Sequence, residues 1–215
     1  MSLTLYFHPL SSFSQKVLIA LYENGTAFEP RIVQFGDEAS RREFVELWRM
    51  GKIPVLKDEA RDWMVPETSI IIEYLDQHYP GATRFIPADP DLARQMRLRD
   101  RFFDLYVNVP MQKIVTDRIR PEDKHDPFGV EEARRLLAMA LELVDGAMES
   151  KEFAAGVEFS MADCAAGPAL WYANEVQPFA EKHPNAYAYL KRLMARPSFA
   201  RALREAEPYL QDFPR

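Results

Sequence analysis

The feature that most constrains the fold is a change of pattern near residue 80. Before it, short β-type segments alternate with amphipathic helix patterns; after it, the strand pattern does not return and the periodicity is helical. Two proline-containing breaks, at residues 79–81 and 87–90, flank this change. The chain is therefore predicted to form two domains, residues 1–79 and 91–215, joined by a linker at residues 80–90.

The first domain is predicted to follow the order βαβαββα. A strand at residues 3–7 precedes a helix at 11–23 and a second strand at 28–35, which is long enough for a crossover between parallel strands. The rest of this domain comprises a polar helix at 38–50, a hairpin of strands at 53–57 and 63–65, and a helix at 69–78. The second domain is predicted to be a helical bundle, with helices at 91–120, 131–148, 160–175, 185–195 and 198–205. The predicted fold is α/β followed by all-α.

Composition argues against several classes of function. The net charge of −6, with Lys and Arg dispersed among carboxylates, argues against a nucleic-acid partner. A single cysteine, Cys164, leaves no intramolecular disulfide or CxxC pair, and the four histidines lie far apart without metal-site spacing. No apolar run is long enough to span a membrane, and no signal peptide is visible. We therefore expect a cytoplasmic protein without a metal.

The turn from the first strand into the first helix carries three serines. Ser11, Ser12 and Ser14 lie where free backbone N–H groups and the helix dipole favour negative charge. A bound thiol ionises more readily at such a place, because the thiolate gains hydrogen bonds that the thiol lacks. Ser11 can donate the decisive hydrogen bond, and Ser12 and Ser14 compete with it for that role. The alternative is that these serines only cap the helix.

A second motif is a proline at the start of the third strand. In Gly51-Lys52-Ile53-Pro54-Val55, a cis bond before Pro54 would turn the N–H and C=O of Ile53 outward, where they can pair with a peptide-like ligand. The alternative, which these residues alone favour, is a trans proline that begins an edge strand.

A third motif is an acidic residue followed by a hydroxyl, immediately before the last helix of the first domain. Glu67 can accept the ammonium group of an amino-acid zwitterion, while Thr68 and the helix N-terminus bind its carboxylate. The alternative is an ordinary N-cap with an acidic first turn.

The order and spacing of these motifs resemble the cytosolic glutathione transferase superfamily over essentially the whole chain. The resemblance rests on the string Ser11–Leu21, on Lys52–Leu56, on Glu67-Thr68 before a helix that ends Tyr74-Leu75, and on a capping box at Ser160–Asp163. The turn is similar to the serine-type classes, theta, zeta and their bacterial relatives, and it lacks the tyrosine or cysteine of other classes.

This resemblance implies a thioredoxin-like first domain that holds glutathione. Pro54 would be the family's cis-proline, and the backbone of Ile53 would pair with the cysteinyl part of glutathione. Lys52 would meet the glycyl carboxylate. Glu67 and Thr68 would bind the γ-glutamyl end, with Thr68 in the place of the usual serine.

The resemblance also implies an activity. Ser11, or Ser12 as the alternative, would stabilise the thiolate of glutathione, which would attack a small hydrophobic electrophile held by the helical domain. A homodimer and a role in detoxification are implied as well. Residues at three- to five-residue spacing on the first long helix can face that cleft or form ordinary core: Phe103, Tyr106, Val107 and Met111. A glutathione-dependent isomerase of the maleylacetoacetate type, or a non-catalytic binding protein on the same scaffold, are the competing functions.

Overall fold

Four strands form one mixed sheet in the computed structural model, which describes residues 2–214. The strand order is β2-β1-β3-β4. β1 (Leu3–Phe7) runs parallel to β2 (Glu29–Ile32) and antiparallel to β3 (Val55–Asp58), which pairs in turn with β4 (Trp63–Pro66). The parallel pair is joined by the crossover helix α1 (Ser12–Glu23), as the sequence predicts. This arrangement is the mixed α/β domain expected for the first part of the chain.

The two faces of the sheet are covered by different helices. Leu3, Leu5 and Phe7 of β1 alternate toward the face that packs against α1 and α3 (Thr68–His78). The opposite face is covered by α2 (Glu38–Leu47), whose single buried residue, Phe44, lies 6.2 Å from the ring of Tyr6. Because α2 is otherwise mostly exposed, it is held mainly by the small apolar cluster of Phe44 with Val33 and Val55.

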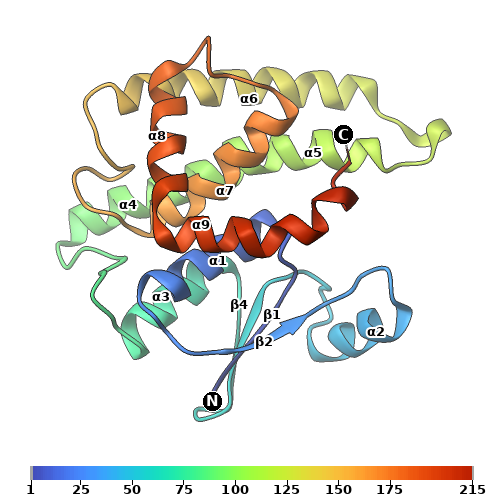
Figure 1. Cartoon of the computed structure of the whole chain (residues 1–215), viewed down its shortest axis with the longest axis vertical. Coiled ribbons are helices and arrows are strands. Elements are labelled where there is room, and N and C mark those ends of the chain that lie inside the picture. The colour runs from blue at the N-terminus through green and yellow to red at the C-terminus, as the bar shows by residue number, and fades with distance from the viewer. Residues whose placement is uncertain (1, 215) are drawn as a thin grey trace.

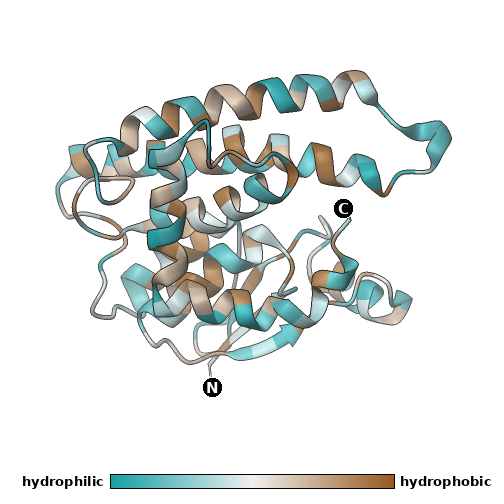
Figure 2. Ribbon diagram, turned by 45° about the horizontal axis from the view of Figure 1, so that its top comes forward, coloured by the Kyte–Doolittle hydropathy of each residue, from teal (hydrophilic) through white to brown (hydrophobic). Residues whose placement is uncertain are grey.

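Between residues 90 and 214, the regular elements are helices (Figure 1). Their bounds are α4 (Pro90–Phe102), the π-helical segment η1 (Phe103–Asn108), α5 (Val109–Arg118), the short η2 (Glu122–Lys124), α6 (Pro127–Met148), α7 (Met161–Val176), α8 (Pro184–Ala195), α9 (Pro197–Ala206) and η3 (Glu207–Asp212). Hydrophobic and hydrophilic residues alternate along these helices (Figure 2), as expected for helices with one buried side. Within residues 2–214, no helix is both long and apolar enough to cross a membrane.

The long helix predicted at 91–120 is interrupted, which corrects the expectation of one continuous helix. Val109 donates its N–H to the carbonyl of Asp104, five residues earlier, so one extra residue is accommodated in the turn. Pro110 follows directly, and its ring has no N–H to donate to the preceding turn. The π-helical turn leaves Asp104 and Asn108 buried, and such turns often occur at functional sites.

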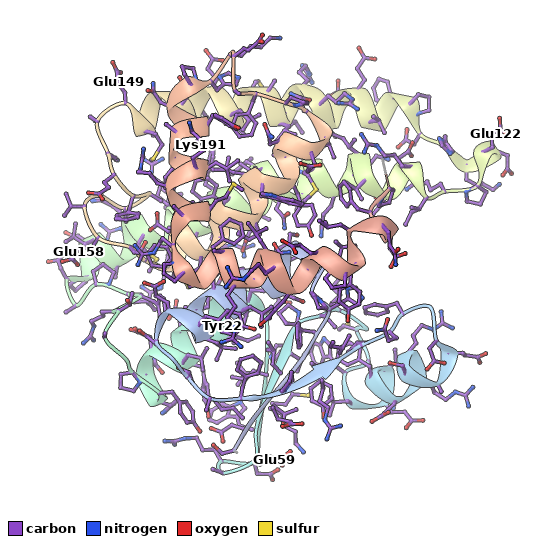
Figure 3. The ribbon with its side chains drawn as sticks, in the orientation of Figure 1. Tyr22, Glu59, Glu122, Glu149, Glu158 and Lys191 are labelled. Carbon is purple, nitrogen blue, oxygen red and sulfur yellow. The ribbon has the colours of Figure 1, made fainter. Side chains whose placement is uncertain are left out.

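The helix α1 belongs to the cores of both domains. It packs against the sheet on one side and against α7 and α9 on the other, so that one apolar cluster extends through the molecule. Tyr22, labelled in Figure 3, lies on α1 where α9 crosses it; its hydroxyl donates to Glu205 at 2.5 Å. Arg201 lies 3.8 Å from the centroid of the same ring. Because α9 packs against α1 through these contacts, the two domains share one core.

Candidate functional site

Ser11 is the N-cap of α1. Its backbone is extended, with φ −81° and ψ 121°, and its Oγ accepts a hydrogen bond from the N–H of Ser14 at 3.2 Å. The N–H of Ser11 donates to the carbonyl of His8 at 3.0 Å, which closes the turn. The capping role expected for a serine here is therefore present. Because Oγ serves as an acceptor in this contact, the hydroxyl hydrogen of Ser11 is still free to donate to a ligand.

The Ile53–Pro54 peptide bond is cis, although the residues alone favour trans. Pro54 is buried and Ile53 is partly exposed. Among the described residues, neither the N–H nor the C=O of Ile53 makes a hydrogen bond outside the regular elements, and β3 begins two residues later. Both backbone groups are thus free to pair with a ligand.

Glu67 lies in the left-handed region of the backbone map, at φ 68° and ψ 118°. An L-residue in such a conformation costs about 1–3 kcal/mol, and residues of this kind gather at ligand-binding sites. Glu67 is the N-cap of α3, yet its carboxylate makes no capping hydrogen bond. The next residue, Thr68, is buried at the start of the helix. The Glu67 carboxylate therefore lies at the N-terminus of α3 but does not cap the helix.

A cavity of about 260 Å³ lies between the two domains. All five residues predicted to bind glutathione line it: Lys52, Ile53, Pro54, Glu67 and Thr68. The remaining lining residues include three that sequence reasoning missed, Arg101, Asp104 and Gln112, which come from α4, η1 and α5. These three lie on the helical domain, and nothing in their local sequence indicates which side of the helix faces the first domain.

A second cavity, of about 510 Å³, adjoins the first, because Ile53 and Gln112 line both. Ser11 and Ser12 line this second cavity and not the first. Its other walls are mainly apolar, and include Leu10, Phe35, Met111, Val115, Ile119 and Phe213. The two serines therefore line the cavity that adjoins the one lined by the predicted glutathione-binding residues.

Of the four residues considered for the electrophile site, Met111 lines the second cavity and the other three do not. Phe103 and Val107 are buried, so they are ordinary core residues, which was the alternative to a role in the electrophile site. Tyr106 is 56% exposed and packs on the ring of Phe102, with the two centroids 5.4 Å apart. The physical reason is that Phe103, Val107 and Met111 recur every four residues on the face that packs into the core, while Tyr106 lies outside that face.

A buried ionic cluster lies behind the first cavity. Lys16 of α1 is only 1% exposed, and its Nζ lies 2.7 Å from Asp100 and 2.8 Å from Asp104. It also donates to the Oγ of Ser69 at 3.0 Å, and this hydroxyl donates to Asp100 at 2.5 Å. Burial raises the pKa of Asp104, while the Lys16 ammonium acts to lower it. Sequence reasoning missed this cluster; a lysine between the apolar positions Phe13 and Val17 of α1 was the available signal.

A third cavity, of about 600 Å³, is lined by none of the predicted site residues. It is lined by residues of the β2 edge, the end of α1 and the C-terminal segment, including Tyr22, Phe28, Arg201 and Tyr209. In the described part of the chain, no cluster of His, Cys, Asp and Glu has the arrangement of a metal site.

Family models match two parts of the chain. Residues 5–83 match the family model "Glutathione S-transferase, N-terminal domain", and residues 110–197 match "Glutathione S-transferase, C-terminal domain". A stringent starvation protein A homolog of Coxiella burnetii is 27% identical, over 98% of this chain and 95% of its own. A probable maleylacetoacetate isomerase of Vibrio cholerae is 28% identical, over 97% of this chain and 98% of its own.

Solved structures show the same fold. A glutathione S-transferase from Methylobacillus flagellatus, with GSH bound, matches with a TM-score of 0.85 and 24% identity, over 94% of this chain and 98% of its own. Poplar glutathione transferase F1 matches with a TM-score of 0.84 and 20% identity, over 97% and 99% of the two chains.

Proposed function

The chain belongs to the glutathione S-transferase family, and from this premise we propose that it binds glutathione between its domains and transfers the activated thiol to a small hydrophobic electrophile. One observation carries the proposal. Five residues from two separate segments, 52–54 and 67–68, all expected to bind one tripeptide, line the same cavity of about 260 Å³.

Each part of glutathione has a partner in this cavity. The free backbone groups of Ile53 pair with the cysteinyl residue, and Lys52 meets the glycyl carboxylate. Glu67, which makes no capping hydrogen bond, accepts the γ-glutamyl ammonium, while Thr68 and the N-terminus of α3 bind the neighbouring carboxylate. The positive φ of Glu67 supports this assignment, because backbone strain of that kind is common at ligand-binding sites.

The thiol is activated at the N-terminus of α1. Backbone N–H groups and the helix dipole favour the thiolate, and Ser11 donates its free hydroxyl hydrogen to the sulfur. The thiol proton passes to solvent water as glutathione binds, so no side chain has to act as a general base. The electrophile then lies in the adjoining cavity of about 510 Å³. Because Ile53 lines both cavities, an electrophile there lies next to the sulfur of glutathione bound in the first cavity.

The matched variants Ser11→Ala and Ser12→Ala test the thiol donor. Ser11→Ala should raise the pKa of the bound thiol, read from thiolate absorbance against pH, and slow conjugation. It also removes a helix cap worth about 1 kcal/mol, and the bound-thiol pKa separates donation from that loss of stability. Unchanged turnover in Ser11→Ala together with lost turnover in Ser12→Ala would assign the donor to Ser12.

Two other functions have specific support from relatives. The Vibrio cholerae relative is described as a probable maleylacetoacetate isomerase, and the Coxiella burnetii relative as a stringent starvation protein A homolog. Calorimetry with glutathione separates the enzymes from a non-catalytic binding protein: no heat of binding at millimolar glutathione contradicts both enzyme functions. A screen of aryl halides, maleyl compounds and peroxides then separates transferase from isomerase.

We further propose a homodimer and a cytoplasmic role in detoxification. Exposed apolar side chains occur on α4 and η1, where Leu98 and Tyr106 are 65% and 56% exposed, and on α6, where Leu143 is 64% exposed. Burying such side chains against a second copy removes apolar surface from water. Leu98→Glu combined with Leu143→Glu should give a monomer in analytical ultracentrifugation, and a wild-type monomer contradicts the dimer.

A further inference from the structure

His8 lines the electrophile cavity together with Ser11 and Asp212. It lies at the end of β1, three residues before the helix cap, and its carbonyl accepts the N–H of Ser11 at 3.0 Å. The imidazole packs against the ring of Tyr209, edge to face, with the centroids 4.9 Å apart. His8 is therefore fixed on the same turn that carries the thiol donor, although neither its sequence position nor the family motif marks it as functional.

The hydrogen bonds of the ring fix its tautomer. Nδ1 of His8 accepts the N–H of Leu10 at 3.2 Å, so the hydrogen of the neutral ring is on Nε2. Burial lowers the pKa of His8, and the Asp212 carboxylate opposes this effect only in part, which favours the neutral ring at neutral pH. Tyr209 faces the ring from η3, and Tyr172 already donates its hydroxyl to the carbonyl of Leu10 at 2.6 Å.

The Nε2–H group of His8 makes no hydrogen bond to any of residues 2–214. His8 is partly exposed, its Nε2 is not among the fully buried side-chain atoms, and the residue lines the cavity. Of the other polar groups that line the cavity, Tyr172 donates to Leu10, and Thr116 donates to the carbonyl of Gln112 at 2.8 Å. The Ser11 hydroxyl is the proposed donor to the sulfur, and the Asp212 carboxylate can only accept hydrogen bonds. A donor therefore faces an otherwise mainly apolar cavity, beside the place proposed for the sulfur.

We propose that His8 donates a hydrogen bond from Nε2 to an oxygen of the electrophile, so that the site prefers α,β-unsaturated carbonyl compounds. The inference rests on the proposed function. The thiolate electron pair forms the S–C bond at the β-carbon, the C=C π pair moves toward the carbonyl carbon, and the carbonyl π pair moves onto oxygen. The Nε2–H stabilises this enolate oxygen and keeps its proton, while water protonates the α-carbon. A neutral imidazole suits this role because it donates without transferring its hydrogen.

Two His8 variants separate the donor from the local structure. His8→Asn can keep an oxygen near the Nδ1 position to accept from Leu10, but it has no group at the Nε2 position. His8→Gln can place its amide N–H near Nε2. Conjugation of glutathione is measured as kcat/KM with 4-phenyl-3-buten-2-one, which has a carbonyl oxygen, and with benzyl chloride, which has none.

His8→Asn should lower the ratio of kcat/KM for the enone to kcat/KM for benzyl chloride by about 10- to 100-fold, because only the enone loses a hydrogen bond to a developing anion. His8→Gln should recover part of the enone activity. An equal fall for both electrophiles, or no fall for the enone, overturns the assignment. Wild-type protein that binds no glutathione, or that conjugates neither compound, overturns the proposed function and this inference with it.

A measurement on the wild-type protein does not depend on the folding of the variants. Nitrogen-15 NMR of the His8 ring at neutral pH should show hydrogen on Nε2 and none on Nδ1. A ring with hydrogen on Nδ1, or a doubly protonated ring at neutral pH, overturns the inference.

Discussion

Replacing Lys16 with methionine should destabilise the protein strongly. The Lys16 ammonium is 1% exposed and lies within 2.8 Å of the carboxylates of both Asp100 and Asp104. Methionine is close to lysine in size, so the change removes the charge and leaves the packing nearly intact. Removing one partner of a buried ion pair lowers the free energy of unfolding by about 3–5 kcal/mol. For a chain of this size, that loss corresponds to a fall of about 6–20 °C in the melting temperature.

The loss should depend on pH in a defined direction. Burial raises the pKa of Asp104, and removing Lys16 takes away the charge that holds it down. An acid whose pKa is raised in the folded state binds a proton more readily there than in the unfolded state, so it adds stability at low pH that is lost as the pH rises through that pKa. The deficit of Lys16→Met should therefore be largest at neutral pH and shrink as the pH falls.

The assay is thermal unfolding by circular dichroism at several pH values. Arg42→Met is the matched control, because it removes an exposed ion pair with Glu38 and should leave the melting temperature nearly unchanged. Lys16→Met combined with Asp100→Asn and Asp104→Asn should recover most of the loss, since no buried charge then remains unpaired. A Lys16→Met protein with the wild-type melting temperature at neutral pH would refute the reasoning.

Three further predictions concern single carboxylates. Hydrogen bonds from Tyr79 and Tyr74 hold the pKa of Asp58 below its ordinary value although burial acts to raise it, so Asp58→Asn should lower the melting temperature at neutral pH and the deficit should shrink as acid protonates the wild-type group. Asp163→Ala should cost at least about 3 kcal/mol in chemical denaturation, because it leaves the N–H groups of Ala154 and Ser160 and the hydroxyl of Tyr189 without an acceptor. Glu67→Gly should change stability by less than about 1 kcal/mol, because relief of the positive φ offsets the greater flexibility of glycine, and it should raise the Kd for glutathione at least tenfold in calorimetry.

The order of elements could be predicted from the sequence because local patterns specify it. The alternation Leu3, Leu5, Phe7 corresponds to the buried face of β1, and Asn24-Gly25 follows the end of α1. Boundaries were less accurate: the second strand is four residues long, at Glu29–Ile32, where eight were predicted at 28–35. All four of its residues are exposed at the sheet edge, so no burial pattern marked where the pairing ends.

Long-range features could not be predicted in the same way. The cis bond at Pro54, the π-helical turn at η1 and the contact of Lys16 with two carboxylates depend on segments that are distant in sequence. The five residues expected to bind glutathione do line one cavity, because Lys52–Pro54 precede β3 and Glu67-Thr68 follow β4, and these two strand ends are paired at Val55 and Pro66. The residues added by the helical domain depend on how α4 and α5 pack against that end of the hairpin, which sequence spacing alone does not specify.

A crystal structure of the protein with glutathione tests the central claim most directly. The account predicts the tripeptide in the cavity of about 260 Å³, with its cysteinyl backbone paired to Ile53, its γ-glutamyl end at Glu67 and Thr68, and its sulfur beside the hydroxyl of Ser11. Glutathione in the larger cavity of about 600 Å³ beside Phe28 and Tyr209, or a sulfur that points away from both Ser11 and Ser12, would contradict it.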